Sequence, residues 1–171
     1  MKAKRILHAL LLASVLMIPS TGILAAPFDD SVSSGRVEVV LAHKYRKNLD
    51  EIKKEFSEAG LTNVHVQLTK VGKPPTNIGF GPSVTAQRAR AAIQMARKYN
   101  RDVTIVLPQR LFPDHYVAIA SSSFDDTVEY PVTPEQLREL ENPALTTEQF
   151  HALYRQLTPT DRPPVRKGRV F

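Results

Sequence analysis

The sequence predicts an α/β protein of the α+β sandwich type, in which a single mixed or antiparallel sheet of four to five strands carries two helices on one face. Three observations support this prediction. Short segments rich in valine and isoleucine alternate apolar and polar residues, as half-buried strands do. Two longer segments place apolar residues at helical spacing. The two kinds of segment also alternate along the chain, and helices that alternate with strands pack on the sheet that those strands form.

The first strand and the first helix are predicted between residues 36 and 60. The apolar side of the strand consists of Val37, Val39 and Leu41. Asn48 then caps a helix, and Glu51 completes a start that resembles a capping box. The inward side of this helix consists of Leu49, Ile52, Phe56 and Ala59. Gly60 ends the helix, because glycine suits the left-handed conformation of a C-terminal cap.

Two more strands lead to a second helix. The apolar residues of the next strand are Val64, Val66 and Leu68. Residues 77–80 form a brief strand, because glycine and proline residues limit it on both sides. Ser83 or Thr85 opens the second helix, which extends to about Tyr99. The inward side of this helix is rich in alanine, which predicts a close approach to the sheet, and consists of Ala86, Ala89, Ile93 and Ala96.

The last two strands and two C-terminal helices complete the pattern. One strand is marked by Val103, Ile105 and Leu107, and the other covers residues 116–120. Thr133 followed by Pro134 is a strong helix start, and Thr146 opens another helix in a similar way. We expect these two C-terminal helices to form an appendage packed on the sandwich.

Residues 1–26 have the composition of a cleavable export signal. Positive residues precede an apolar run, and the small residues that end at Ala26 are of the kind that signal peptidase cuts. The apolar run is shorter than the about 20 residues that a membrane-spanning helix needs. We therefore expect a periplasmic or secreted protein with no stable membrane insertion after signal cleavage. An uncleaved membrane anchor is the alternative.

The rest of the chain divides by composition into four parts. We expect a linker over residues 27–35, the α/β sandwich domain over residues 36–124, the helical appendage over residues 133–158 and a basic tail over residues 159–171. The prolines and basic residues of the tail predict that it is disordered.

The net charge of +6 is concentrated at the two ends of the chain. The body between the export signal and the tail has equal numbers of acidic and basic residues. A nucleic-acid-binding domain needs a basic face on its folded body, so we expect no nucleic-acid partner. Within the body, no acid occurs between Glu58 and Asp102, whereas acids dominate after Asp102. These charges form a solvated dipolar surface or pair between the two halves, or else the basic stretch, with Arg90 and Arg97 of the second helix, meets an anionic envelope partner.

The chain contains no cysteine, which excludes disulfides, cysteine-ligated zinc, thiol catalysis and a lipid anchor on cysteine. Its histidines are scattered without the spacing of metal ligands. Residues 79–83 join a strand to a helix but lack the spacing of a phosphate-binding loop. We therefore expect no metal and no cofactor.

From residue 36 to about residue 124, the sequence resembles the small sandwich domains of the SPOR type and the C-terminal domains of LytR-type cell-wall proteins. The likeness rests on the valine-rich first strand, on the helix that ends in Ala59-Gly60-Leu61, and on the segment Asn77-Ile78-Gly79-Phe80-Gly81. SPOR domains bind peptidoglycan glycan strands that lack stem peptides, so the resemblance implies an envelope-binding module. The C-terminal appendage departs from this family pattern and could cover the sheet face that such domains use.

If the helices cover one face of the sheet, the other face carries the alternate strand residues. These are Glu38, Val40, His65, Gln67, Thr69, Thr104, Val106, Tyr116 and Ala118. A mixture of aromatic, amide and imidazole groups with small apolar ones suits a sugar. The candidate binding residues are His65, Gln67, Thr104 and Tyr116 on the sheet, with Arg90 and Arg97 on the second helix. The alternative is that this face is half buried beneath the apolar residues of the appendage.

These observations favour an exported binding or accessory protein of the cell envelope, whose partner is peptidoglycan glycan or an envelope protein. A small envelope hydrolase is a second hypothesis, in which His43 or His115 at a strand end acts with a nearby serine or aspartate. No Gly-x-Ser-x-Gly elbow surrounds any serine, which weighs against it. A structural subunit of a secretion or conjugation apparatus, docked by its basic tail, is a third hypothesis.

Overall fold

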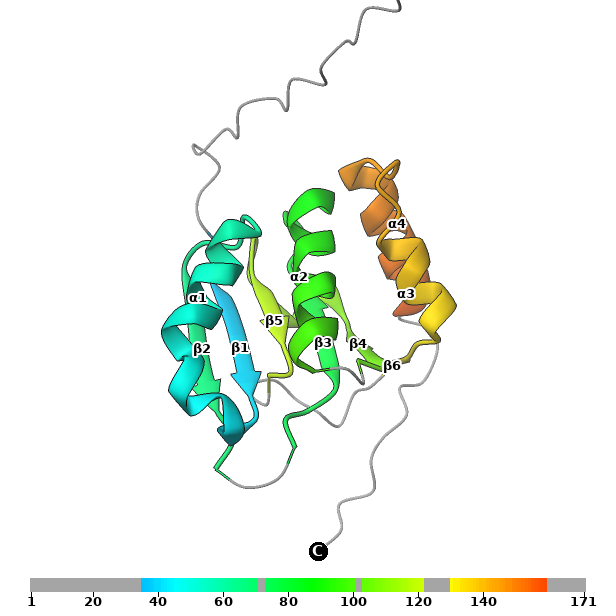
Figure 1. Ribbon diagram of the computed structural model, residues 1–171. Helices are drawn as coiled ribbons and strands as arrows, with labels where there is room; N and C mark the ends of the chain where they lie inside the picture. Colours follow the sequence, from blue (N-terminus) through cyan, green and yellow to red (C-terminus); the bar gives the residue numbers. More distant parts are fainter. Residues whose placement is uncertain (1–34, 71–72, 101–102, 122–129, 160–171) are drawn as a thin grey trace, which may run out of the picture.

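A computed structural model describes residues 35–70, 73–100, 103–121 and 130–159 (Figure 1). The predicted export signal, the linker up to residue 34, the end of the sandwich domain at residues 122–124 and the basic tail from residue 160 lie outside these ranges. Within the described ranges, no helix has the length and apolar character needed to cross a membrane.

Within these ranges, six strands form one mixed sheet in the order β2-β1-β5-β3-β4-β6. The strands are β1 (Val37–Leu41), β2 (Val64–Leu68), β3 (Asn77–Phe80), β4 (Ile105–Leu107), β5 (Val117–Ile119) and β6 (Tyr130–Pro131). β1 runs parallel to β2 and β5, β3 runs parallel to β4, and the pairs β3–β5 and β4–β6 are antiparallel. The predicted α/β fold is confirmed, with six strands in place of four to five. The additional strand, β6, has two residues and is too short to show an alternating pattern.

The described part of the chain contains four α-helices, which lie on one face of the sheet (Figure 1). They are α1 (Leu49–Glu58), α2 (Ala86–Tyr99), α3 (Pro134–Leu140) and α4 (Thr147–Leu157), with two short 3-10 helices, η1 (His43–Asn48) and η2 (Gln109–Leu111). α1 connects the parallel strands β1 and β2, and α2 connects β3 and β4. Connections between parallel strands are right-handed. The face that the connecting helix covers therefore depends on two things: the direction of the strands, and the side on which the second strand lies. The two units run in opposite directions and step toward opposite edges, and both helices therefore cover the same face.

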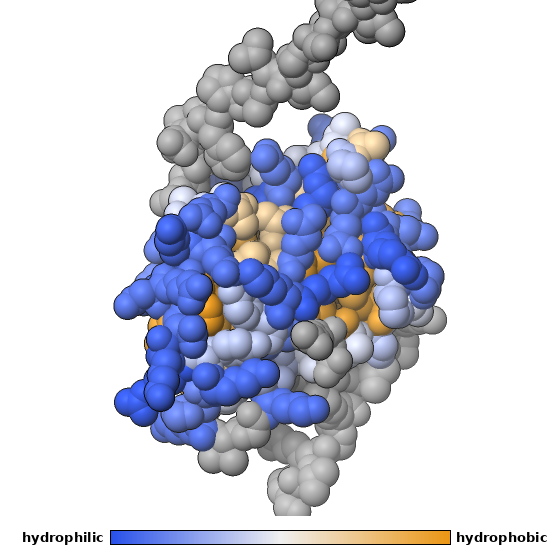
Figure 2. All heavy atoms as spheres, viewed as in Figure 1, coloured by the Kyte–Doolittle hydropathy of each residue, from blue (hydrophilic) through white to orange (hydrophobic). Residues whose placement is uncertain are grey.

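The helix-covered face holds the main hydrophobic core. Ala89 and Ile93 of α2 are buried, which confirms the predicted inward side of that helix. Ile52 and Phe56 of α1 are buried as predicted, but Leu49 is half buried. The expectation that Ala59 faces inward is wrong, because α1 ends at Glu58 and Ala59 is exposed. The strand residues in the same cluster include Val37, Val39, Ile78, Phe80, Val117 and Ile119. The outer sides of the helices are mostly hydrophilic (Figure 2). The two amphipathic helices thus shelter one side of the sheet, as their patterns predict.

The two C-terminal helices pack on this same face. The ring centroid of Phe80, on β3, lies 5.6 Å from that of Phe150 and 5.4 Å from that of Tyr154, both on α4. Leu153 and Leu157 are partly buried against the main core. The alternative expectation, that these helices cover the opposite face of the sheet, is therefore wrong.

Local capping signals set most of the helix starts. The threonines that accept a backbone hydrogen bond as N-caps are Thr85, Thr133 and Thr146. Asn48 differs, because η1 leads directly into α1 and the Asn48 side chain makes no cap bond. Its amide donates instead to the Glu51 carboxylate at 3.2 Å. Gly60 has a φ of 80° directly after α1, in the left-handed conformation that the sequence predicts.

β4 faces the opposite way from the prediction. The sheet register pairs Val106 with Ile78 of β3, and both residues are buried in the main core. Ile105 and Leu107 therefore face the side without helices, where they join a second apolar cluster. The expectation that Val106 lies on that side is wrong. A three-residue strand that is apolar on both sides has no alternation, so neighbouring strands decide its register.

A buried histidine fastens α4 to two other parts of the fold. His151 Nε2 donates to the Val84 carbonyl, with 2.7 Å between the nitrogen and the oxygen. Its Nδ1 accepts a hydrogen bond from the side-chain amide of Gln109. Burial is the main cause that lowers the pKa of His151; the bond to Val84 raises that pKa and the charge of Arg155 lowers it. The fold therefore favours the neutral imidazole.

We expect acid to destabilise the protein through His151. The unfolded chain binds a proton near the ordinary histidine pKa of about 6.5, whereas the folded chain binds it at lower pH. The free energy of unfolding should hold its full value above pH about 6.5 and fall as the pH drops toward the folded pKa. Urea unfolding at a series of pH values measures this loss. His151→Gln should reduce the pH dependence, and His65→Gln, at an exposed position, should keep it. Equal pH dependence in wild type and His151→Gln would contradict the assignment.

Candidate functional site

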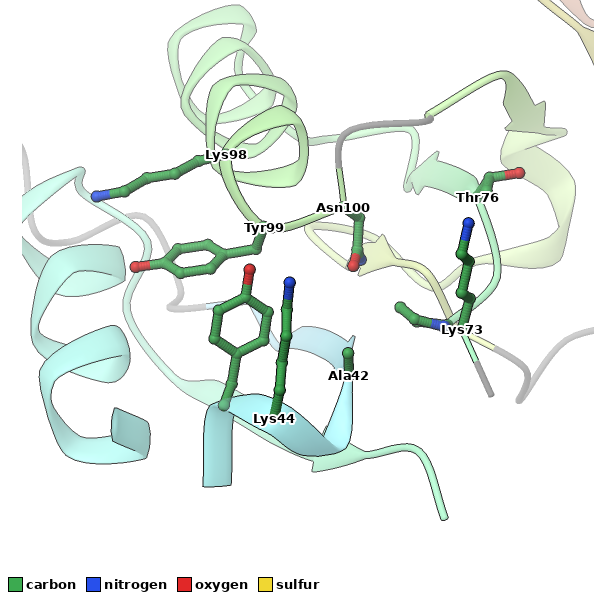
Figure 3. Close-up of a pocket in the computed structure, with 9 residues that line it drawn as sticks. Ala42, Lys44, Lys73, Thr76, Lys98, Tyr99 and Asn100 are labelled. Atoms are coloured by element: carbon green, nitrogen blue, oxygen red, sulfur yellow. The ribbon is translucent and has the colours of Figure 1, made fainter. Parts of the chain in front are cut away.

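A cavity of about 380 Å³ opens at the end of the sheet where β1 finishes and β3 begins (Figure 3). Its lining residues are Ala42, Lys44, Tyr45, Lys73, Pro74, Thr76, Lys98, Tyr99 and Asn100. These residues follow β1, precede β3 and end α2. The three segments meet because β3 runs antiparallel to β5, and β5 runs parallel to β1. The end of β1 and the start of β3 therefore lie at the same end of the sheet.

Lysine is the charged residue of this lining. Lys98 lies in the last turn of α2 and pairs with the Glu55 carboxylate at 2.6 Å. Lys44 of η1 and Lys73, in the segment that leads to β3, lie on either side of the Asn100 carboxamide (Figure 3). Within the described residues, neither lysine has a carboxylate partner. These two ammonium groups are therefore available to an anion.

Two tyrosines form an aromatic wall of the cavity. The ring centroids of Tyr45 and Tyr99 lie 5.4 Å apart in an edge-to-face arrangement, and Tyr99 also stacks on Phe56. The Tyr99 hydroxyl donates to the Glu55 carboxylate. Burial, followed by this bond, raises the pKa of Tyr99, while the bonds from Lys98 and Tyr99 lower the pKa of Glu55. Packing and hydrogen bonding thus hold the wall in one position.

Asn100 contributes a buried amide to the cavity. The residue is 7% exposed, and its Nδ2 donates to the Val40 carbonyl at 3.2 Å. That bond determines which end of the amide is the nitrogen. Among the described residues, Asn100 Oδ1 has no hydrogen-bond donor. A buried acceptor without a donor costs about 1–3 kcal/mol, and this oxygen is shielded from solvent.

None of these cavity residues is among the binding residues predicted from the sequence. Lys44 comes just after the first strand, and the carboxyl ends of strands are common binding positions in α/β sheets, so one signal was present. Lys73 and Asn100 lie in segments whose composition indicates a turn and a helix end. Their meeting with Lys44 depends on the direction of β3, which the sequence pattern does not determine.

The predicted sugar-binding residues of the sheet lie in three separate places. His65 and Gln67 are exposed on β2, and the alternate residues of that strand pack against the main core. Tyr116 precedes β5, on the other side of β1. The Thr104 hydroxyl lies 3.2 Å from the hydroxyl of Thr76, which lines the cavity. The structure therefore brings His65 and Gln67 together, and places Tyr116 and Thr104 elsewhere.

Tyr116 belongs to a buried polar cluster on the face without helices. Glu38 of β1 is 3% exposed, and its two carboxylate oxygens accept hydrogen bonds from Tyr116 and Ser121, each at 2.5 Å. Arg36 lies 3.8 Å from the same carboxylate. Burial, followed by the bond to Glu38, raises the pKa of Tyr116. Two hydrogen bonds to one charged group are strong, so this cluster links β1 to the segments on both sides of β5.

A local segment covers part of the face without helices. Phe112 follows η2, and its ring lies so close to Gly79 of β3 that an added Cβ would overlap it. Tyr116 stacks on Phe112 with 6.0 Å between ring centroids. Leu107 and Ala118 complete this second apolar cluster. Strands β3, β4 and β5 are therefore packed on both faces.

Arg90 and Arg97, the predicted binding residues of the second helix, both contact the C-terminal part of the chain. Arg90 donates to the backbone carbonyls of Asn142 and Leu145 at 3.2 and 3.3 Å. Arg97 pairs with the Glu141 carboxylate at 2.6 Å. These contacts correspond to the intramolecular alternative for the segregated charges, and they tie α2 to the connection between α3 and α4.

The two histidines of the hydrolase hypothesis lie next to different ends of the strands. His43 follows the end of β1, and His115 precedes the start of β5. Because β1 and β5 are parallel, the two positions lie at opposite ends of these strands. Within the described residues, no group of three or more His, Cys, Asp and Glu is arranged to hold a metal ion.

Comparisons of this chain with protein-family models, with curated proteins and with solved structures gave no match. The resemblance to SPOR-type domains therefore stays a prediction. The function is inferred from the geometry of the cavity and of the sheet.

We expect Gly79 to be intolerant of a side chain. Gly79→Ala should lower the free energy of unfolding by about 1–3 kcal/mol, because the new Cβ overlaps the Phe112 ring. Adding Phe112→Leu should recover part of this loss relative to the sum of the two single changes, since a smaller side chain makes room. Urea unfolding of the two single variants and the double variant measures the coupling. Strictly additive losses would contradict a direct contact.

Proposed function

We propose that this chain is an exported binding or accessory protein of the cell envelope, which holds an anionic ligand between Lys44 and Lys73. The observation that carries the proposal is that these two ammonium groups flank one cavity and have no carboxylate partner among the described residues. Like charges beside a shared cavity repel each other, and a bound anion offsets that repulsion. The aromatic wall holds one of these groups in place, because the Lys44 ammonium lies 5.0 Å from the centroid of the Tyr45 ring.

The cavity fits this function better than the face without helices. On that face, the hydroxyl of Tyr116 already donates to Glu38, and Phe112 covers Gly79. His65 and Gln67 remain exposed on that face, on the edge strand β2, and neither of them lines the cavity. At the cavity, charged, aromatic and amide groups converge on open space, which is the usual composition of a binding site.

The composition of the lining favours recognition over catalysis. Among the described residues, the lining includes three lysines and two tyrosines but no His, Asp, Glu or Ser, which are the side chains that most often act as general bases or nucleophiles. Glu55, which lies behind Tyr99 and Lys98, is already bonded to both of them. A cationic and aromatic lining therefore supports binding of an anionic group.

Peptidoglycan glycan is the first ligand to test. Export would place the protein in contact with the cell wall, and glycan strands without stem peptides carry a free carboxylate on each muramic acid unit. Such carboxylates match the two lysines of the cavity in charge. An acidic envelope protein is the other partner to test.

We expect the purified protein to sediment with peptidoglycan sacculi, and added salt to weaken this association, because screening reduces attraction between exposed charges. The double variant Lys44→Glu/Lys73→Glu should reduce the bound fraction at low salt by about tenfold or more, since it replaces two attractive contacts with repulsive ones. Sedimentation followed by quantification of the bound protein measures the effect.

The matched control is Lys53→Glu/Lys54→Glu, which changes the net charge equally at exposed positions of α1 outside the cavity. This variant should bind nearly as well as wild type. Equal losses in the two double variants would contradict binding at the cavity. No sedimentation of the wild type with sacculi would exclude the glycan ligand.

A further inference from the structure

The backbone of β2 is open along one side, at the edge of the sheet (Figure 1). Among the described strands, β2 is paired with β1 alone. The Asn63 carbonyl and the Thr69 N–H form hydrogen bonds with β1 at either end of this pairing. Because the backbone groups of successive strand residues point to opposite sides, those of Val64, Val66 and Leu68 point away from β1.

The two edges of the sheet differ in their protection. At the other edge, β6 consists of Tyr130 and Pro131, and proline has no backbone N–H to offer another strand. β2 has five residues and contains no Asp, Glu, Lys, Arg or Pro. Its two valines and its leucine are only partly buried. Proteins usually protect an edge with a very short strand, a lysine or a proline, so the unprotected β2 edge is suited to pairing with another strand.

The polarity of β2 is symmetric about its central residue, Val66. An antiparallel copy of β2 centred there places Val66 opposite Val66, Val64 opposite Leu68, and His65 opposite Gln67. The outward backbone groups of the two strands then form about six hydrogen bonds. Each apolar side chain lies opposite an apolar one, and no like charges lie opposite each other. The β2 edge is therefore complementary to a second copy of itself.

His65 and Gln67 add a polar contact on the face without helices. Both side chains are exposed, and the Nε2 atom of His65 lies 3.2 Å from Asn63 Oδ1. An amide oxygen only accepts hydrogen bonds, so this contact places the ring proton on Nε2 and leaves Nδ1 as an acceptor. The side-chain amide of Gln67 from the other copy has the N–H donors that match this acceptor. The two residues form a non-hydrogen-bonded backbone pair, in which opposite side chains lie close together.

We propose that two copies of this chain associate through β2, with the two strands antiparallel and centred on Val66, so that one sheet continues across a two-fold axis. The inference is independent of the proposed anion-binding function, because β2 contributes no residue to the lining of the cavity.

Sedimentation velocity of the purified protein over a range of concentrations tests the assembly, and we expect a monomer–dimer equilibrium. The variant His65→Lys/Gln67→Lys places like charges opposite each other twice across the axis, at positions that are exposed in the single chain. It should weaken dimerisation by about tenfold. The control Ala152→Lys/Gln156→Lys adds equal charge at exposed positions of α4 and should dimerise like wild type. A monomeric wild type at every concentration, or equal dimerisation of the two variants, would overturn the proposal.

A disulfide tests the register, since the chain has no cysteine of its own. In His65→Cys/Gln67→Cys, each new cysteine lies opposite a cysteine of the other copy, at a spacing that a disulfide can bridge. Mild oxidation should therefore produce a covalent dimer on a non-reducing gel. The single variants His65→Cys and Gln67→Cys should remain mostly monomeric on the same gel, because neither cysteine lies opposite itself. Equal cross-linking of the single and double variants would overturn the pairing centred on Val66.

Discussion

The structure depends on β5, which pairs with β1 on one side and with β3 on the other. It runs parallel to β1 and antiparallel to β3, so it joins two right-handed strand–helix–strand units that point in opposite directions. Units opposed in this way place α1 and α2 on one face of the sheet and bring the end of β1, the start of β3 and the end of α2 to one end of the sheet (Figure 1). Asn77 strengthens the join, because its buried amide donates to the Ser121 carbonyl just after β5. The cavity is a consequence of this arrangement.

Side-chain packing and buried polar bonds hold the C-terminal helices to the sheet in a chain without cysteine. Tyr154 is fully buried in α4, and its hydroxyl donates to the Leu107 carbonyl at the end of β4, at 2.6 Å. Arg90 and Arg97 bond the connection between α3 and α4 from the other side. The acid-poor and acid-rich halves of the sequence thus meet inside one molecule. The lysines at the cavity are the basic groups of this chain that the proposed function assigns to a ligand.

Features that a few neighbouring residues determine could be predicted from the sequence. The helix start at Thr133 and the left-handed Gly60 are examples, because both depend on groups within one turn of the chain. The side of the sheet that Val106 faces could not be predicted, since β4 is apolar throughout and its register comes from β3. The cavity could not be predicted for a related reason. Asn100 has no sequence signal of its own, and its meeting with Lys44 requires the opposed directions of two distant strands.

Ligand recognition should therefore occur at the end of the sheet that the opposed units create, and not on the face without helices. Mapping of backbone amide chemical shifts in isotope-labelled protein during a titration with glucuronate locates binding most directly. We expect saturable shifts at Lys44, Thr76 and Asn100, with little change at His65 and Gln67. Shifts centred on His65 and Gln67, with Lys44 and Asn100 unchanged, would contradict recognition at the cavity.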